Sequence, residues 1–326
     1  MRDFANSLPL TVTVLDNHAL NPGDNPFPKI PGIASIESWP RSTAFQAAER
    51  ALNADIVITN KTPLSAAMID KLPCLKFIAV TATGYNVVDL AAARSRDIPV
   101  SNVPDYGTST VAQFTMSLIL ALCHRVETHA QSVTAGEWVS SPDWCYWKTP
   151  QVELQNRILG IVGFGRIGKR VAELGYAFGM KVVYASQQRS EVVTIPAEQV
   201  SLEKLFQDAD VVSLHCALTR ENRGFVNRER LRSMKRTAFL INTARGQLVE
   251  EADLAAALRE QTIAGAAVDV LSEEPPSPSN PLLYAPNCLI TPHIAWSTLS
   301  ARQRILQATV ANIGAFLSGA PINVVN

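Results

Sequence analysis

The sequence contains little cysteine and no excess of either charge. Its 326 residues include five cysteines, an odd number, and none of them belongs to a C-x-x-C pair. This pattern argues against a disulfide framework and against zinc clusters, so we expect no metal site and a reducing, cytoplasmic setting. Lys plus Arg number 29 and Asp plus Glu number 29, which gives a formal net charge of zero at pH 7. A nucleic-acid partner is therefore not expected, because binding to phosphates normally requires a basic excess.

Long uninterrupted apolar runs are also missing. The first ten residues, MRDFANSLPL, contain no apolar stretch that could serve as a signal peptide. The segment 109–130 is the most apolar helical candidate, and a membrane span is the competing interpretation. Gln113, Ser117, His124 and Arg125 make that interpretation the weaker one. We expect a soluble protein of about two domains, at roughly 150 residues per domain.

Short β-branched runs alternate with helical patterns along the first third of the chain, which is typical of a parallel sheet with crossover helices. The expected strands are 11–15, 56–59, 77–80 and 99–101. The expected helices between them are 42–53, 65–71 and 88–95. A long buried helix with a Ser/Thr cap is expected from residue 109. The loop after it contains Trp138, Trp144, Tyr146 and Trp147, and we expect these aromatic side chains to pack on something.

A second series of strands and helices begins near residue 157. The expected strands are 157–162, 181–184, 211–214, 238–242, 264–269 and 289–291. The expected helices are 167–178, 202–207, 228–234 and 251–260. This series predicts a complete doubly wound parallel sheet. A final helix over 299–317, capped by Ser297, has to dock elsewhere, and the first α/β unit is the place that we expect.

A glycine-rich segment, Gly163-Phe-Gly165-Arg-Ile-Gly168, follows an apolar strand and opens a helix. Glycines in these places permit a tight turn and the close approach of a pyrophosphate to the helix N-terminus, where N–H groups and the helix dipole favour an anion. The pattern alone is weak evidence. The order strand, turn, helix, strand favours a dinucleotide site over a plain glycine-rich turn, with S-adenosylmethionine as the nearest rival ligand.

The acidic residue that usually follows about 20 positions later, where it binds the adenosine ribose of NAD, is missing from this sequence. Such a carboxylate would repel a 2′-phosphate, whereas Ser186, Gln187 and Arg189 can hydrogen-bond to one or pair with it. The alternative is that Arg189 is an ordinary solvated loop residue. We predict NADP(H) or NAD(H) as the cofactor, with NADP(H) favoured.

Polar and ionisable side chains follow four successive strands of the second series. Ligands of open α/β sheets bind beyond the carboxyl ends of the strands, so these side chains should share one rim. They are His215, Cys216, Arg245, Asp269, Glu274 and His293. Arg245 can hold an α-keto acid, His293 can exchange a proton with the reacting oxygen, and Glu274 can orient the histidine. Taken singly each has an ordinary structural explanation, but together they predict a catalytic set.

Six motifs spread over nearly the whole chain carry a family resemblance. They are TATGYNVVDLAAA at 81–93, NVPDYGTSTVAQ at 102–113, LGIVGFGRIGKRVAELGYAFGMKV at 159–182, INTARGQLVEEADLAAAL at 241–258, AAVDVLSEEPP at 266–276 and NCLITPHIAW at 287–296. Together they resemble the D-2-hydroxyacid dehydrogenase family. In finer detail, ITNKTPL at 58–64, SPDWCYW at 141–147 and the PHIAW ending look most like its glycerate dehydrogenase, or hydroxypyruvate reductase, branch.

The resemblance implies an arrangement of domains and roles for individual residues. A Rossmann-type NAD(P)-binding domain, 104–295, is inserted into a flavodoxin-like substrate domain, 1–103 with 296–326, and the protein is a homodimer. Arg245, Glu274 and His293 form the catalytic set. Main-chain groups of Ala82, Thr83 and Gly84 bind the substrate carboxylate. Cofactor contacts beside the three glycines carry over to Arg166, Ile167, Cys216, Thr243, Ala244, Arg245, Asp269, His293 and Ala295.

We therefore predict an oxidoreductase that transfers a hydride between NAD(P)H and a small 2-keto acid. The expected reactions convert hydroxypyruvate to D-glycerate and glyoxylate to glycolate, with His293 as the proton donor. A dehydrogenase for another 2-hydroxy acid and a nucleotide-sensing protein without activity are the alternatives. The complete set of Arg245, Glu274 and His293 favours the enzyme, because a sensor does not need it. The aromatic loop either closes the substrate pocket or contacts a second subunit.

Overall fold

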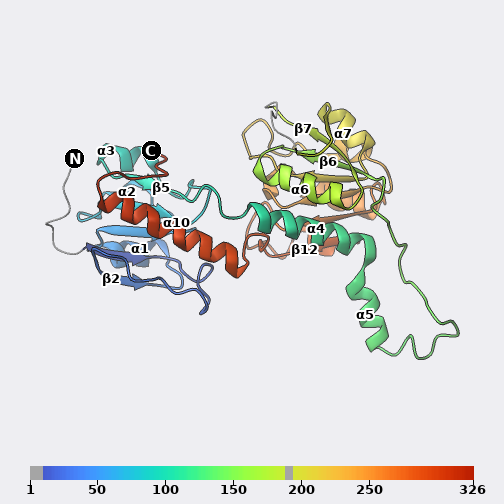
Figure 1. Cartoon of the computed structure of the whole chain (residues 1–326), viewed down its shortest axis with the longest axis horizontal. Coiled ribbons are helices and arrows are strands. Elements are labelled where there is room, and N and C mark those ends of the chain that lie inside the picture. Colours follow the sequence, from blue (N-terminus) through green and yellow to red (C-terminus); the bar gives the residue numbers. More distant parts are fainter. Residues whose placement is uncertain (1–9, 188–193) are drawn as a thin grey trace. The chain divides into compact units, whose positions relative to one another are not determined.

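The structure is a computed structural model, and it describes residues 10–187 and 194–326. The chain divides into two compact units. Unit 1 comprises Met1–Tyr106 and Ser297–Asn326, and unit 2 comprises Gly107–Trp296. Each unit is a parallel sheet with helices on both faces (Figure 1).

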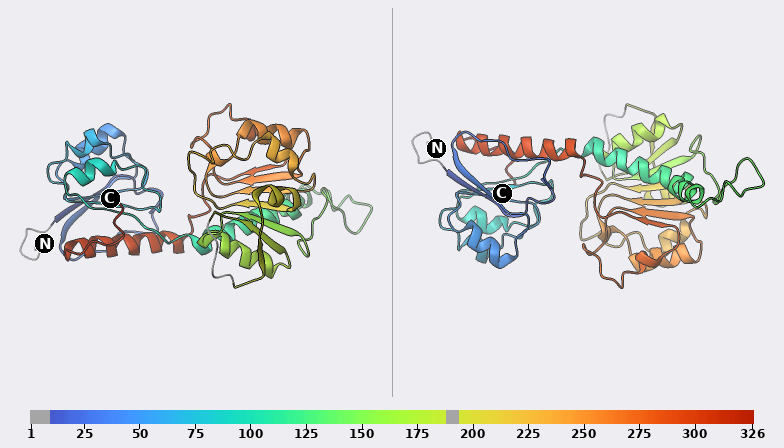
Figure 2. Two further views of the ribbon diagram at one scale, coloured as in Figure 1. Left: turned by 90° about the horizontal axis from the view of Figure 1, so that it is seen from above. Right: turned by 90° about the horizontal axis from the view of Figure 1, so that it is seen from below.

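Unit 1 contains a five-stranded parallel sheet. Its strands lie in the order β2 (Ile33–Ser38), β1 (Leu10–Val14), β3 (Ile56–Thr59), β4 (Phe77–Val80) and β5 (Val100–Ser101). This 2-1-3-4-5 order is that of flavodoxin-like sheets, as predicted. One face carries the helices α1 (Ala44–Ala51), α2 (Ala66–Ile69) and α3 (Leu90–Ser95), and the other carries α10 (Leu299–Leu317) (Figure 2).

Buried strands that alternate from face to face give unit 1 a hydrophobic cluster on each side of its sheet. On β3, Val57 packs with the helices α1 to α3, whereas Ile56 and Ile58 belong to the cluster under α10. In that second cluster the rings of Phe77 and Phe316 stack with their centroids 4.6 Å apart. The terminal helix therefore docks on the first α/β unit, as expected from the sequence.

Unit 2 contains a seven-stranded parallel sheet. Its strands lie in the order β12 (Cys288–Ile290), β11 (Gly265–Val268), β10 (Phe239–Asn242), β9 (Val211–Leu214), β6 (Ile158–Val162), β7 (Lys181–Ala185) and β8 (Ala197–Gln199). This is the Rossmann order with one added strand, and the strand order reverses between β6 and β9. One face carries α4 (Thr108–His124) and α6 (Arg166–Ala177), and the other carries α7 (Leu202–Asp208), α8 (Arg228–Ser233) and α9 (Glu251–Arg259). The predicted fold class is confirmed.

Two strands that the sequence did not predict, β2 and β8, lie at edges of the two sheets. In β2 only Ile33 and Ile36 are half-buried, and the other four residues are exposed. β8 is the tripeptide Ala-Glu-Gln. Edge strands of this kind are short or exposed to solvent. They carry no alternating apolar pattern, and therefore cannot be predicted from the periodicity of apolar residues.

The single long helix expected from residue 109 is instead two helices, α4 and α5 (Val126–Thr134). Arg125 between them has φ +46°, in the left-handed region, which ends the hydrogen-bond ladder of α4. The expected Ser/Thr cap is absent, because Gly107 precedes α4 and makes no side-chain hydrogen bond to it. In the described part of the chain, no helix has both the length and the apolar character that crossing a membrane requires.

The N-terminus of α10 also differs from the prediction. Thr298, and not Ser297, caps this helix, because the Thr298 hydroxyl accepts a hydrogen bond from the Ala301 N–H over 3.2 Å. Ser297 lies one residue too early to serve the same N–H. The body of the helix spans the predicted residues.

Residues 126–151, which we call the arm, project from the sheet of unit 2 as α5 and the loop that follows it (Figure 1). Trp138 Nε1 donates a hydrogen bond to the Trp144 carbonyl over 3.0 Å, so the loop is closed on itself. Within this chain the expected packing is not seen for Trp144 and Trp147, whose exposed fractions are 87% and 69%, and packing on a second subunit stays a prediction. The arm thus presents large apolar side chains to its surroundings.

The last residues of the chain pair with the edge strand β5 of unit 1. Ser101 forms an antiparallel bridge with Val324. The Val325 N–H donates to the Val100 carbonyl over 2.8 Å, and the Asn326 side chain accepts from the Val100 N–H over the same distance. This edge of the sheet is therefore covered by the C-terminal segment.

Candidate active site

A glycine turn joins β6 to α6 at the point where the strand order reverses. Gly163 has φ +90°, which only glycine adopts without strain. A Cβ at Gly168 would collide with the Gly163 carbonyl oxygen, so the helix packs tightly on the turn. A Cβ at Gly165 would meet no atom within 4 Å, and Gly165 offers no side-chain cap to the first N–H groups of α6. The turn therefore fits the pyrophosphate of a dinucleotide.

The end of β7 lies beside the glycine turn. Phe164 of the turn stacks on Tyr184 of β7 with ring centroids 3.9 Å apart, and both rings are buried. Ser186 and Gln187 follow β7 at this rim, and the Ser186 carbonyl accepts a hydrogen bond from the Gln199 side chain over 3.1 Å. Arg189, the third residue predicted to approach a phosphate, lies outside the described residues.

The residues after β9 pack directly against the glycine turn. The His215 N–H donates to the Val162 carbonyl over 2.7 Å, and a Cβ at Gly163 would approach the Cys216 nitrogen to 2.5 Å. The Nε2 atom of His215 lies 2.8 Å from the Ser213 hydroxyl. Burial lowers the pKa of His215 to about 3 and raises the pKa of the Cys216 thiol. Both side chains are therefore uncharged near pH 7, although the sequence suggested ionisable groups here.

The Asn242 side chain shapes the turn after β10. Its Oδ1 atom accepts from the Ala244 N–H over 3.0 Å, and its Nδ2 atom donates to the Arg245 carbonyl over 2.9 Å. The Thr243 hydroxyl lies 3.0 Å from that of Thr115 on α4. The exposed Arg245 side chain donates to the Ala244 carbonyl, and it forms no ion pair with any described carboxylate. Such an arginine can take an anionic ligand.

The Asp269 carboxylate holds the segment that carries His293. Asp269 follows β11 and is 1% exposed. Its Oδ1 atom accepts from the Thr291 hydroxyl over 2.6 Å and from the Ile294 N–H over 2.9 Å, and its Oδ2 atom accepts from the Ala295 N–H over 2.8 Å. Burial raises the pKa of this carboxyl, and the three hydrogen bonds oppose the rise. The predicted contacts of Asp269 and Ala295 with a cofactor stay predictions.

His293 adopts φ +56°, a left-handed conformation that costs a non-glycine residue about 1 kcal/mol or more. Its N–H donates to the carbonyls of Asp269 and Thr291 over 2.8 and 2.9 Å, which stabilises this conformation. Its Nδ1 atom lies 2.6 Å from Glu274 Oε2, and Glu274 Oε1 accepts from the Leu271 N–H over 3.1 Å. No described residue bonds the His293 Nε2 atom. Pairing at Nδ1 makes Nε2 the nitrogen that can exchange a proton with a ligand.

The predicted carboxylate-binding segment of unit 1 follows β4. The Ala82 carbonyl accepts from the Val103 N–H over 3.0 Å, and the Thr83 carbonyl accepts from the Asn102 side chain over 2.8 Å. The Thr83 hydroxyl donates to the Val103 carbonyl over 2.9 Å. Across residues 10–187 and 194–326, no acceptor is bonded to the N–H groups of Ala82, Thr83 and Gly84. The segment therefore has peptide donors to offer to an anion.

Asp16, just after β1, holds the loop beside this segment. Its carboxylate accepts from the N–H groups of Asn60, Lys61 and Thr62 over 2.7, 2.6 and 2.7 Å, and from the Thr62 hydroxyl over 3.0 Å. The Asn60 side chain then donates to the Thr81 carbonyl over 2.9 Å. Asp16 was not predicted, although the position of an acid at the carboxyl end of a strand was a usable signal.

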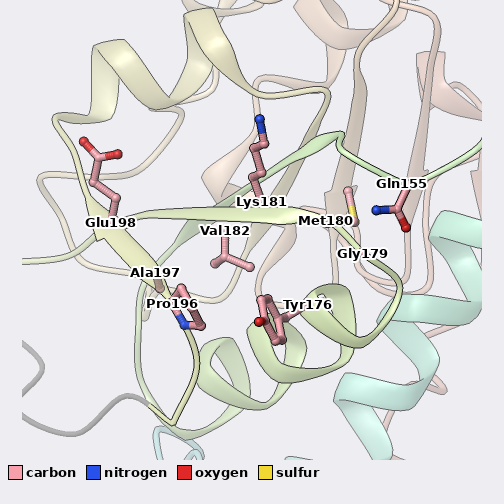
Figure 3. A pocket seen from close by; sticks show the side chains of 9 residues that line it. All are labelled: Gln155, Tyr176, Gly179, Met180, Lys181, Val182, Pro196, Ala197 and Glu198. Carbon is pink, nitrogen blue, oxygen red and sulfur yellow. The ribbon is translucent and has the colours of Figure 1, made fainter.

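A depression of about 780 Å³ lies elsewhere on unit 2 (Figure 3). Its polar lining includes the side chains of Gln155, Tyr176, Lys181 and Glu198. Lys181 begins β7, so the depression lies at the amino end of that strand, whereas the glycine turn lies at the carboxyl ends. It does not belong to the candidate active site. Among the residues that the structure describes, no group of three His, Cys, Asp or Glu side chains is arranged to hold a metal.

A Rossmann sheet with a glycine turn at its switch point and a histidine–glutamate pair at the same rim is typical of nucleotide-dependent oxidoreductases. The family model described as the NAD-binding domain of D-isomer specific 2-hydroxyacid dehydrogenases matches residues 116–295. The chain is 41% identical over 321 residues to a hydroxypyruvate reductase of Blautia hydrogenotrophica, which covers 97% of this chain and 100% of the relative. It is 40% identical over 285 residues to a glycerate dehydrogenase of Methylorubrum extorquens, which covers 87% and 89%. The chain belongs to the D-isomer specific 2-hydroxyacid dehydrogenase family.

Solved structures agree with this membership. A Thermus thermophilus protein is 36% identical, with a TM-score of 0.84 over 97% of this chain and 100% of the other. An acyclic imino acid reductase in complex with NADPH and D-Arg is 26% identical, with a TM-score of 0.81 over 97% and 100%. A D-lactate dehydrogenase of Aquifex aeolicus in complex with NAD and lactic acid is 28% identical, with a TM-score of 0.78 over 95% and 96%. The predicted dependence on a nicotinamide cofactor is confirmed.

Proposed function

We propose that this enzyme reduces hydroxypyruvate to D-glycerate and glyoxylate to glycolate, with His293 as the proton donor. The observation that carries the proposal is the 2.6 Å contact between His293 Nδ1 and Glu274 Oε2, at the rim that also holds the glycine turn. The similarity to a hydroxypyruvate reductase and to a glycerate dehydrogenase supports this substrate class. A bound nicotinamide nucleotide supplies the hydride to the keto carbon.

In the proposed reaction, His293 gives the proton on Nε2 to the keto oxygen as that oxygen becomes the alcohol. The Glu274 carboxylate accepts the Nδ1–H bond and stabilises the protonated imidazole. Arg245, which pairs with no described carboxylate, orients the substrate and offsets the negative charge that develops on its oxygen. In the reverse direction, His293 takes the proton from the alcohol.

Unit 1 is proposed to bind the substrate carboxylate. The supporting observation is that the N–H groups of Ala82, Thr83 and Gly84 are bonded to no described acceptor, while the carbonyls of Ala82 and Thr83 are held in place. Two or three converging peptide N–H groups form an anion site without a charged side chain. Under this proposal the peptide groups of unit 1 bind the carboxylate of the substrate, and unit 2 binds the nucleotide and supplies Arg245 and His293.

The nucleotide is proposed to lie along the rim of unit 2, with its pyrophosphate at the N-terminus of α6. Gly163, Gly165 and Gly168 provide the necessary space. The remaining proposed contacts are Arg166, Ile167, Ser186, Gln187, Cys216, Thr243, Ala244, Asp269 and Ala295. We propose a preference for NADP(H), because β7 ends in Tyr184-Ala185 and is followed by Ser186 and Gln187 rather than by an acid.

Steady-state assays with NADPH or NADH, each combined with hydroxypyruvate, glyoxylate or pyruvate, test the substrate and cofactor together. We expect the highest kcat/KM with hydroxypyruvate or glyoxylate and a lower KM for NADPH than for NADH. His293→Gln should lower kcat by about 10²- to 10⁴-fold, the usual contribution of a general acid, and change the Kd for the nucleotide only slightly.

His124→Gln, on α4 of the same unit, is the matched control and should keep full turnover. Normal turnover of the His293→Gln variant would refute His293 as the proton donor. A higher kcat/KM with pyruvate than with either proposed substrate would overturn the substrate assignment. A lower KM for NADH would overturn the cofactor preference alone.

We also propose a cytoplasmic homodimer. The arm supports the dimer, because the exposed fractions of its Trp138, Trp144 and Trp147 are 52%, 87% and 69%, and apolar surface of this kind is typical of protein interfaces. The five cysteines are free thiols, which fits a reducing compartment. A mass of one chain by light scattering at micromolar concentration would contradict the dimer.

A further inference from the structure

The main chain of Ser272 is bonded on both sides by side chains of one neighbouring segment. The Ser272 N–H donates to Glu251 Oε1 over 2.6 Å. The Gln247 side chain donates to the Ser272 carbonyl over 2.8 Å. Gln247 lies in the turn after Arg245, and Glu251 begins α9. Ser272, an exposed loop residue, is thus hydrogen-bonded at both of its main-chain groups.

The second oxygen of Glu251 extends this contact along the same loop. Glu251 Oε2 accepts from the Asn280 side chain over 2.8 Å, and Asn280, 8% exposed, caps the next helical turn by accepting from the Leu282 N–H over 3.0 Å. Glu251 therefore bonds the loop at Ser272 and again at Asn280. Hydrogen bonds to a carboxylate are stronger than those between neutral groups.

Ser272 is adjacent to the residue that holds Glu274. Leu271, next to Ser272, is buried and donates its N–H to Glu274 Oε1 over 3.1 Å. A Cβ at Gly246 would collide with the Leu271 carbonyl, so the turn that carries Arg245 packs directly on this loop. The contacts run from Glu251 through Ser272 and Leu271 to Glu274, and from there to His293.

We propose that Glu251 is a positioning residue, which fixes the Glu274 carboxylate against His293 by holding the peptide of Ser272. Gln247 assists by holding the carbonyl of the same residue. This inference rests on the proposed roles of Glu274 and His293 in proton transfer. A carboxylate is required at position 251, because both of its oxygens accept from N–H donors and an amide can accept at only one of them.

The test compares Glu251→Gln, Glu274→Gln and the double variant of the full-length enzyme, with Glu260→Gln at the other end of α9 as the matched control. The expected effect of Glu251→Gln is a fall of about tenfold in kcat for hydroxypyruvate, since small displacements of a catalytic group are costly. The alkaline limb of the kcat–pH profile should move to lower pH, because the protonated imidazole loses part of its anionic partner. The Kd for the nucleotide should not change.

The double variant distinguishes positioning from general destabilisation. If Glu251 acts through Glu274, Glu251→Gln should have no further effect on kcat or on the pH profile in the Glu274→Gln background. Urea unfolding of each variant reports any loss of stability separately. Gln247→Leu, which removes the bond to the Ser272 carbonyl without a change of charge, should give a smaller shift in the same direction.

The outcomes separate the two proposals. If Glu274→Gln leaves kcat and the pH profile unchanged, the proposed function fails. If Glu274→Gln acts but Glu251→Gln only lowers the unfolding midpoint, or if the two effects on kcat multiply, the positioning role is refuted while the proposed function stands. A shift with Glu260→Gln as large as that with Glu251→Gln would also refute it.

Discussion

The two units share one architecture, yet they present different chemistry at the carboxyl ends of their strands. In unit 2 these ends carry charged or ionisable side chains, above all Arg245, Glu274 and His293. In unit 1 the acid in the corresponding place, Asp16, is bonded to the backbone of its own loop, and the adjoining segment offers peptide N–H groups. A doubly wound sheet can thus carry ionisable side chains at the ends of its strands, or offer main-chain donors there.

The units also differ in how the chain completes them. Unit 2 is one continuous stretch, whereas unit 1 needs α10 from the far end of the sequence. The cluster under α10 contains Phe77, which is fully buried, and Phe316, which is 5% exposed. Separate hydrophobic clusters in the two units predict that each can be weakened without the other.

The largest effect is expected from Phe316→Ala, which removes the ring stacked on Phe77. Loss of a buried phenylalanine costs about 3–5 kcal/mol of unfolding free energy, through lost burial and the cavity that remains. Urea unfolding followed by the far-ultraviolet signal should show an earlier transition for unit 1. Nucleotide binding, measured by NADPH fluorescence, should persist beyond it.

Phe45→Ala, at a ring that is 73% exposed on α1, is the control and should change little. If nucleotide binding is lost in the first unfolding transition of the Phe316→Ala variant, the two units do not unfold independently.

A smaller effect is expected from Asp16→Asn, which leaves one accepting oxygen for a loop that now bonds to two. Unfolding free energy should fall by about 2–3 kcal/mol, since bonds to a charged acceptor are replaced by weaker ones or lost. If the rim of unit 1 binds the substrate carboxylate, KM for hydroxypyruvate should rise several-fold with an unchanged Kd for the nucleotide. Asp70→Asn, at an exposed acid of the same unit, is the control, and a rise in the nucleotide Kd instead of KM would reverse the division of roles.

The smallest effect is a pH dependence that belongs to unit 2. Burial lowers the pKa of His215 to about 3, so the folded state keeps it neutral where the unfolded state binds a proton, below about pH 6.5. The stability that this provides is present above pH 6.5 and is lost as the pH falls toward 3. Between pH 7 and 6, the wild type should lose about 0.7 kcal/mol more unfolding free energy than His215→Gln. His18→Gln in unit 1 should follow the wild type, and equal pH slopes for the wild type and His215→Gln would contradict the burial of a neutral imidazole.

Much of the fold could be predicted, because buried parallel strands have short runs of apolar residues in the sequence. β3, β4 and β9 begin and end at the predicted residues, and so does α10. Arg125 could not be predicted as a break between helices, because arginine is a good helix former and its left-handed conformation depends on tertiary contacts. The edge strands β2 and β8 could not be predicted, because most of their residues are exposed and carry no alternating apolar pattern.

The site was predictable to the extent that strand ends converge on one rim. Glu274 and His293 are 19 residues apart, and their contact depends on a left-handed residue and on the bonds of Asp269, neither of which has a local signature. Glu251 looked like an ordinary acid in the first turn of a helix, where a negative charge is favoured in any case. Its bonds to Ser272 and Asn280 join residues that only the folded loop brings together.

The pairing of residues 324–326 with β5 has a consequence for synthesis on the ribosome. Translation delivers all of unit 2 by residue 296, while the strands of unit 1, made first, still lack the helix that covers one face of their sheet. Apolar residues such as Ile56, Ile58 and Phe77 remain exposed to solvent until residues 297–326, which include α10, have been synthesised. The strands of unit 1 are thus translated before unit 2, yet one face of their sheet is covered only after unit 2 has been made, and apolar surface that stays exposed during synthesis favours aggregation.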